Sequence, residues 1–370
     1  MSSHLLMDNW TLQNVAEVLD EGFDPDTASE IEFMPDGVNY GYKDLSAAYV
    51  QLECLLQLLN NIVLADACYV DDQSIDTWQG RSEVLDSVFE TGLVVGRSFD
   101  QDRETWVAVR EAIVEQLCSC PGMKETHLEN VRTFKAKQPQ PDRMLGQLLW
   151  GGAGMLARSR YFGLPYVTHP LRERMLQKAG HYKREANAHQ HLRQFVETQR
   201  MGMFRELAGN GFYASLRLPP IAMEVLNKAA DVDEILPIAI QMREEFKELR
   251  QWLAEFQRAL ELDDRDNLEA KQNIFNSVAR YLESRRSNAA FGETTLQVSV
   301  TDLPRVGTKP MVWLNAMQNK FGVRAQINRM MWTPAGVSVV RRLLGFFGQD
   351  QTTLAVSLEQ ELLRRNSVVA

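Results

Sequence analysis

The chain has 370 residues, of which 45% are hydrophobic and 24% charged, and its formal net charge is -9. This is the composition of a folded globular protein, and it excludes disordered, collagen-like and low-complexity classes. The sequence pI near 5.3 also argues against a dedicated nucleic-acid-binding protein, whose domains are usually strongly basic.

Targeting and cysteine signals favour a cytoplasmic location. The first ten residues contain Asp8 and no lysine or arginine, so we expect no secretory signal. No apolar run approaches the roughly 20 residues of a membrane-spanning helix, so we expect no transmembrane segment. Reduced thiols are expected at Cys54, Cys68, Cys118 and Cys120. Because Cys118 and Cys120 are too close for the usual zinc spacing, and His127 leaves a fourth ligand missing, we predict no metal or cofactor.

We predict an α+β, helix-dominated fold that begins with an acidic mixed α/β domain at 1–133. Alternating residues flank a Pro-Asp-Gly turn at 35–37, which indicates a β-hairpin. Asp44 is expected to cap the next helix. The remaining elements predicted here are a helix to about 60, strands at 62–70 and 91–96, and helices at 79–91 and 101–118.

Two further domains are predicted after a proline-containing linker at 134–143. A basic helical domain covers 144–286, with helices at 144–161, from 170 to about 209, from about 220, and from about 231 or 233. A small C-terminal α/β domain covers 287–370, with a strand–helix–strand unit and two final helices. Its elements are strands at 295–301 and 323–328 and helices at 309–321, 337–347 and 353–365.

Charge is divided unevenly along the chain. Residues 1–130 carry 25 acidic and 6 basic side chains, whereas residues 131–230 carry 6 acidic and 16 basic ones. Complementary charge favours docking of the acidic part on the basic part of the same chain. The alternative is that the basic segment contacts phosphates of an external nucleic acid.

Residues 235–260 show the clearest helical periodicity. Two apolar series repeat every seven residues and form a seam that contains Met242, Phe246, Leu249, Leu253 and Phe256. Such a seam is typical of one helix in an intramolecular bundle. The alternative is a coiled coil with another chain, which would allow self-association through 235–260.

An acidic cluster follows the predicted strand at 62–70. It consists of Asp66, Asp71, Asp72 and Asp76. Carboxylates at strand ends hold divalent cations in metal-dependent nucleases, where the metal activates water. Turn formation and helix capping explain the same residues without a metal, so these four are only candidate catalytic residues.

A stretch of alternating arginines and aromatics is the most distinctive local pattern. It supplies candidate nucleic-acid or partner contacts at Arg158, Arg160, Tyr161, Tyr166, Arg172 and Arg174. Aromatic rings stack on bases, and arginine pairs with phosphates. The alternative is a rigid turn between two helices whose aromatic side chains fill the core. The helix at 337–347 is likewise expected to dock within the protein or on a partner rather than lie on a membrane.

No phosphate-binding loop, nucleophile elbow or zinc-protease motif occurs in the sequence, and His181, His189 and His191 form no ligand pattern. We therefore expect a non-enzymatic cytosolic component that binds another protein as an accessory or adaptor subunit. The alternatives are a metal-dependent nuclease or phosphoesterase that uses the aspartate cluster, and a nucleic-acid-binding module.

Overall fold

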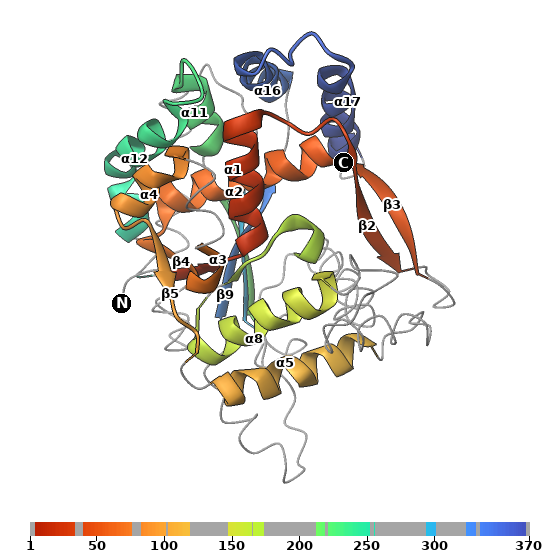
Figure 1. Cartoon of the computed structure of the whole chain (residues 1–370). Coiled ribbons are helices and arrows are strands. Elements are labelled where there is room, and N and C mark those ends of the chain that lie inside the picture. Colours follow the sequence, from red (N-terminus) through yellow and green to blue (C-terminus); the bar gives the residue numbers. More distant parts are fainter. Residues whose placement is uncertain are drawn as a thin grey trace, which may run out of the picture.

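The computed structural model describes residues 4–33, 40–75, 83–100, 103–118, 147–164, 166–173, 212–218, 221–251, 255, 294–300, 323–330 and 334–367 (Figure 1). Helices dominate this part of the chain, and they surround a small parallel sheet. The predicted helix-dominated α+β class is thus confirmed.

The parallel sheet has four strands in the order β5-β4-β1-β6. They are β1 (His4–Met7), β4 (Ala67–Asp71), β5 (Val94–Arg97) and β6 (Tyr166–Val167). All three pairings are parallel. The carboxyl ends of the four strands therefore share one edge, and the residues that follow each strand gather there.

Between β1 and β4 the chain forms two helices and a hairpin. Helix α1 (Asn9–Glu21) packs against α2 (Ala47–Leu64), and β2 (Thr27–Phe33) pairs with β3 (Tyr40–Ser46). The antiparallel register of β2 and β3 confirms the predicted hairpin. The helix cap was predicted two residues too early, because the Ser46 hydroxyl rather than Asp44 accepts the backbone N–H of Tyr49, 3.3 Å away.

Helix α2 is the centre of the core. Fifteen of its 18 residues are buried, including Leu52, Leu55, Leu58 and Leu59. By length and composition α2 also qualifies as a membrane span, but most of it lies inside the protein, as in the core helix of a soluble fold. The predicted strand at 62–70 was wrong in its first half, because residues 62–64 continue this buried helix and β4 begins only at Ala67.

After β4 come three short elements and two longer helices. The short ones are α3 (Asp72–Ile75), η1 (Glu83–Leu85) and α4 (Asp86–Glu90). Helix α5 (Arg103–Cys118) confirms the prediction at 101–118. A π-helical turn, η2 (Gln147–Gly151), leads into α8 (Gly152–Phe162), which packs against α5. Gly163 ends α8 with a left-handed φ of 65°, a conformation that favours glycine.

A second sheet is antiparallel, in the order β7-β8-β9. Its strands are β7 (Phe212–Leu218), β8 (Thr294–Val300) and β9 (Val323–Met330). Both predicted C-terminal strands are present, and they are direct antiparallel neighbours. The helix predicted between them lies outside the described residues.

The predicted seam begins in α12 (Ile235–Glu245), which packs with α11 (Ile221–Lys228) against α2. Met242, Phe246 and Leu249 are buried in this intramolecular core, whereas Leu253 and Phe256 lie outside the described residues. Burial of the first three is what the intramolecular bundle predicts, and self-association through 235–260 stays a prediction. Helix α12 ends at Glu245 with Phe246 as its C-terminal cap, and residues 247–251 are helical again, so the predicted helix is interrupted at Phe246.

The chain closes with α16 (Pro334–Phe346) and α17 (Thr353–Ser367), as predicted. Arg341 of α16 pairs with Glu359 of α17 at 2.7 Å, and α16 packs on α11. One hydrophobic core joins α1 and α2 to α8, α11, α12, α16 and α17. The predicted linker at 134–143 lies outside the described residues, and the predicted domain limits remain a prediction. The shared core gives the finer division into three domains no support.

Candidate functional site

The topology of the parallel sheet identifies one edge as the candidate site. From β1 the chain moves to β4 and β5 on one side, and it later returns to β6 on the other side of β1. In open parallel sheets, ligands bind outside the carboxyl ends of the strands where the order reverses in this way. Continued by two residues, the β1–β4 register places Asp8 beside Asp71 of β4, and in the β4–β5 ladder Asp71 lies opposite Arg97 of β5. We call Asp8, Asp71 and Arg97, together with the side chains that contact them, the carboxyl-edge site.

Asp8 is the most buried charged group of the carboxyl-edge site. It follows the apolar strand β1 and caps helix α1, where Oδ1 accepts the backbone N–H of Trp10 at 3.0 Å. The same oxygen accepts from Nη1 of Arg172 at 2.7 Å, and Oδ2 accepts the hydroxyl of Tyr166. Its side chain is 0% exposed. Both oxygens are therefore engaged, and neither is open to solvent.

The pKa of Asp8 reflects two opposing influences. Burial raises it, but the positive charge of Arg172, the proximity of His169 and the Tyr166 hydrogen bond together bring it below its ordinary value. The pKa of Tyr166 moves up, because the phenol is buried and lies next to the Asp8 carboxylate. Asp8 is thus ionised and Tyr166 is a neutral donor, which is the pairing that the hydrogen bond requires.

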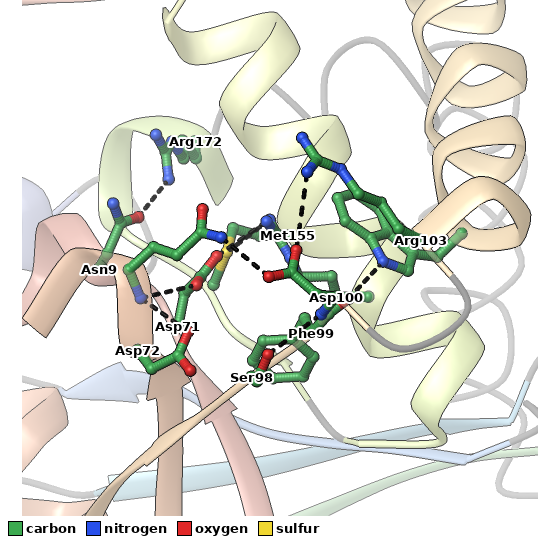
Figure 2. A network of polar contacts seen from close by, with 12 residues as sticks. Asn9, Asp71, Asp72, Ser98, Phe99, Asp100, Arg103, Met155 and Arg172 are labelled. Carbon is green, nitrogen blue, oxygen red and sulfur yellow. Dashed lines mark hydrogen bonds and ion pairs between the residues drawn. The ribbon is translucent and has the colours of Figure 1, made fainter.

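Arg172 is held on several sides at once. Its guanidinium carbon lies 3.9 Å from the ring centre of Trp10, and Nη1 also donates to Asn9 Oδ1 at 3.2 Å (Figure 2). Gly151 passes directly beside the guanidinium, where a β-carbon would collide with Nη2. The glycine run at 151–154 therefore has a local use, since Gly151 leaves room for a buried arginine.

A histidine completes this side of the site. Leu171 donates its backbone N–H to Nδ1 of His169 at 3.3 Å, and Nε2 lies 2.9 Å from Asn14 Oδ1. Since Nδ1 is an acceptor here, the ring proton belongs on Nε2, which donates to Asn14. The histidine stands edge-on to Trp10 and is buried. It thus helps to anchor the loop after β6 to helix α1.

A second ion pair lies one strand away. Nη2 of Arg158, from α8, contacts Asp71 Oδ2 at 2.8 Å, and both side chains are mostly buried. Burial raises the pKa of Asp71, while Arg158 and the backbone N–H of Gln73 act in the opposite direction. Burial also lowers the pKa of Arg158, and Asp71 opposes that change. The guanidinium carbon of Arg158 lies 4.3 Å from the ring centre of Trp106.

Two more carboxylates lie at the solvent side of this pair. The backbone N–H of Gln73 donates to Asp72 Oδ1 at 2.8 Å, and its side-chain amide donates to Asp100 Oδ2 at 3.2 Å. Asp100 follows β5 and faces Arg103 across 3.7 Å, with both side chains more than half exposed (Figure 2). Within the described ranges, no group of three or more histidine, cysteine or acidic residues is arranged to hold a metal ion.

The aspartates predicted to form one cluster therefore do not all lie together in the structure. Asp66 precedes β4 whereas Asp71 ends it, so the whole strand separates them, and Asp76 lies outside the described residues. Asp8 and Asp100 come to the same edge instead. Asp8 had a readable signal, because it is an N-cap residue directly after an apolar strand. Asp100 had none that distinguishes it from other exposed acids.

The predicted basic stretch turns largely inward. Arg158, Tyr166 and Arg172 all face carboxylates of the first 130 residues, as docking of the acidic segment on the basic one predicts. Tyr161 packs edge-on to Phe162, and burial lowers the pKa of Arg160. Arg174 lies outside the described residues, as do His127, His181, His189 and His191.

The described cysteines are buried and unbridged. Cys54 lies in α2 and Cys68 in β4. Burial raises the pKa of Cys68 to about 12, although Arg243 acts against it, so this thiol stays protonated. Cys120 and the side chain of Cys118 lie outside the described part of the chain. Cys54 and Cys68 therefore act as small core residues rather than nucleophiles.

No protein-family model, curated protein or solved structure matches this chain.

Proposed function

We propose that this protein is a non-enzymatic, cytosolic component that binds another protein as an accessory subunit. The proposal rests on one observation. The strand topology brings the carboxylates of Asp8 and Asp71 to the carboxyl edge, and each forms an ion pair with an arginine of the same chain. Asp8 pairs with Arg172 and Asp71 pairs with Arg158.

This pairing favours a structural role for the carboxyl edge. A catalytic carboxylate has to reach a substrate, a water or a metal ion. Asp8 has both oxygens engaged and no exposed surface, so it reaches none of them without breaking its contacts with Arg172 and Tyr166. The two ion pairs instead connect the acidic first part of the chain to the helical residues 170–173 after β6 and to α8.

A binding role needs an accessible surface, and α17 offers one. Val356 and Leu363 are the large hydrophobic residues exposed in the described part of the chain, each with 46% of its surface accessible. They are seven residues apart and therefore lie on the same face of α17. The helix lies at the periphery of the molecule, beside α16 (Figure 1). Its opposite face is occupied, since Ala355, Leu358 and Leu362 belong to the core.

Replacing Val356 with aspartate is expected to weaken partner binding about tenfold, because a charge at the centre of an apolar contact costs more than 1 kcal/mol. The measurement is affinity purification of the tagged chain from its own cells, with half of the lysate treated with nuclease. A stoichiometric protein should remain after nuclease treatment and be largely lost with Val356→Asp.

The matched control is Ser357→Asp, which adds the same charge to the next exposed position, about 100° around the helix. It should retain the partner, and both variants should melt at the temperature of the natural chain. Equal recovery by all three proteins would exclude α17 as the contact. Recovery of nucleic acid without a protein would favour the nucleic-acid-binding alternative.

A second function is favoured by a separate observation. Asp71, Asp72 and Asp100 lie close enough that Asp72 and Asp100 both raise the pKa of Asp71. Carboxylates at the ends of adjacent strands are the usual ligands of catalytic divalent cations. We therefore keep a metal-dependent phosphoesterase as the alternative proposal, with these three aspartates in place of the group predicted from the sequence. Because the three side chains are not arranged to hold a metal ion in the described part of the chain, this alternative requires them to move together when a cation binds.

This alternative predicts that millimolar Mg²⁺ or Mn²⁺ raises the melting temperature, because a ligand that binds only the folded state stabilises it. The double variant Asp71→Asn/Asp72→Asn should abolish the shift. Asp66→Asn is the control, since Asp66 lies at the opposite end of β4 and should leave the shift intact. A melting temperature that does not respond to either cation would eliminate the metal-dependent alternative.

A further inference from the structure

Arg110, in the middle of α5, has more hydrogen-bond donors than its surroundings accept. Its side chain is only 18% exposed, and its Nε is buried with no partner among the described residues. The ion pair with the neighbouring Glu111 spans 3.8 Å from Nη2, which is too long for a hydrogen bond. A buried donor without an acceptor is costly, so the arrangement requires an explanation.

Two tryptophans fix the orientation of this guanidinium. Its central carbon lies 3.9 Å from the ring centre of Trp150 in η2 and 5.5 Å from that of Trp106 in α5. Contact with an aromatic face stabilises the cation but supplies no acceptor for its N–H groups, which point outward in the guanidinium plane. Arg110 is therefore held in place, with its donors directed away from the rings that hold it.

Two further arginines lie nearby. Arg103, Trp106 and Arg110 follow the three- and four-residue spacing of one face of α5, and that helix packs against α8, which carries Arg158. Burial lowers the pKa of Arg110, Glu111 acts in the opposite direction, and the positive charges of Arg158 and Arg103 lower the pKa further. The Nε of Arg158 is also buried without a partner in the described part of the chain.

Gly154 of α8 borders two of these side chains. A β-carbon built there would lie 3.4 Å from Cδ of Arg110 and 3.6 Å from Nη1 of Arg158, which is ordinary van der Waals contact. We call Arg103, Arg110 and Arg158 the α5–α8 arginine group.

The acids around this group do not satisfy it. Asp71 already contacts Arg158 at 2.8 Å, and Asp100 faces the exposed Arg103 across 3.7 Å. An added anion would offset the positive charge that Arg103 and Arg158 place near Arg110, and its oxygens would accept charged hydrogen bonds from guanidinium groups. A carboxylate has two oxygens, whereas a phosphate presents three or four in a tetrahedral arrangement, which suits guanidinium groups carried by two neighbouring helices.

We propose that the α5–α8 arginine group binds the phosphate group of a small phosphorylated ligand, with Arg110 as its main contact. This inference does not depend on the proposed protein-binding function, and α17 takes no part in it. It also does not require the Asp8–Arg172 pair to open.

The probe is inorganic phosphate, measured with the full chain by calorimetry and by thermal melting against sodium chloride at equal ionic strength. Phosphate should bind and raise the melting temperature, and Arg110→Gln should weaken that binding about tenfold, as expected for the loss of a charged hydrogen-bonding group. Arg341→Gln is the control, because Arg341 lies in α16 and pairs with Glu359, and it should bind as the natural chain does.

Two results would overturn the proposal. One is equal affinity for phosphate in the natural chain and in Arg110→Gln, including the absence of binding in both. The other is binding of a short single-stranded RNA that depends on Arg110 while inorganic phosphate does not bind, since the site would then be specific for a nucleic-acid backbone. Arg110→Lys distinguishes charge from geometry. It keeps the positive charge but lacks the planar donors, so it should recover only part of the affinity.

Discussion

Replacing Asp8 with asparagine is expected to lower the free energy of unfolding by about 3–5 kcal/mol, because it leaves the buried Arg172 without its counter-charge. Asparagine retains the length of the side chain and caps a helix as well as aspartate does. The loss therefore reports the charge pair and not the N-cap of α1. Urea unfolding of the two proteins at pH 7 measures it.

Three companion variants separate the contacts of Asp8. Asp8→Ala should cost about 1 kcal/mol more than Asp8→Asn, because it also removes the cap. The double variant Asp8→Asn/Arg172→Met should recover much of the loss, since a neutral methionine leaves no unpaired charge. Asp71→Asn should cost less than Asp8→Asn, because burial of Asp71 already disfavours its charged form. A change in Asp8→Asn below about 0.5 kcal/mol, the usual range for surface substitutions, would contradict the structural role of the pair.

The same pair predicts a pH dependence with a definite sign. The pKa of Asp8 in the folded protein lies below its ordinary 3.8, so the unfolded chain binds its proton more readily than the folded one. The stabilisation is therefore complete above about pH 4 and disappears as the pH falls through the lowered pKa. Asp8→Asn should lack this component of acid denaturation, which comparison of urea midpoints between pH 3 and pH 6 would reveal.

The sequence predicted those elements whose signals are local. The hairpin follows from alternation around a Pro-Asp-Gly turn, and α5 and α17 follow from helical periodicity that is uninterrupted by glycine or proline. Helix α16 follows from the apolar face that begins after the Pro-Ala-Gly at 334–336. The strand at 62–70 was half wrong because an apolar run looks the same at the end of a buried helix and in a buried strand. Only the packing of α2 into the core decides between them.

The candidate site was harder to predict, because its residues come from distant segments. Asp71 and Arg158 were each singled out, but as parts of separate hypotheses. Their pairing depends on where α8 lies relative to β4, which no local pattern states. Asp8 was noted only for its charge near the start of the chain. Its partners lie more than 150 residues away, and parallel strand order is what brings them together.

Phe246→Ala is expected to lower the free energy of unfolding by about 3–5 kcal/mol, and it addresses the seam directly. Phe246 is 2% exposed, at the end of the helix that packs on α2. Arg243 of that helix donates to the backbone oxygen of Ala65 at 2.8 Å, which fixes α12 against the end of α2. Removing the ring leaves a cavity that these fixed neighbours fill only in part.

The dependence of the melting temperature on protein concentration distinguishes an intramolecular helix from a coiled coil between two chains. If Phe246 packs within the chain, the melting temperatures of the natural chain and the variant should not change between micromolar and tenfold higher protein concentrations. A coiled coil between two chains would melt at higher temperature as concentration rises, because association is coupled to folding. Lys247→Ala is the control, since its exposed side chain should contribute less than about 0.5 kcal/mol. If the melting temperature rises with concentration and Phe246→Ala abolishes that rise, the result would support self-association through residues 235–260.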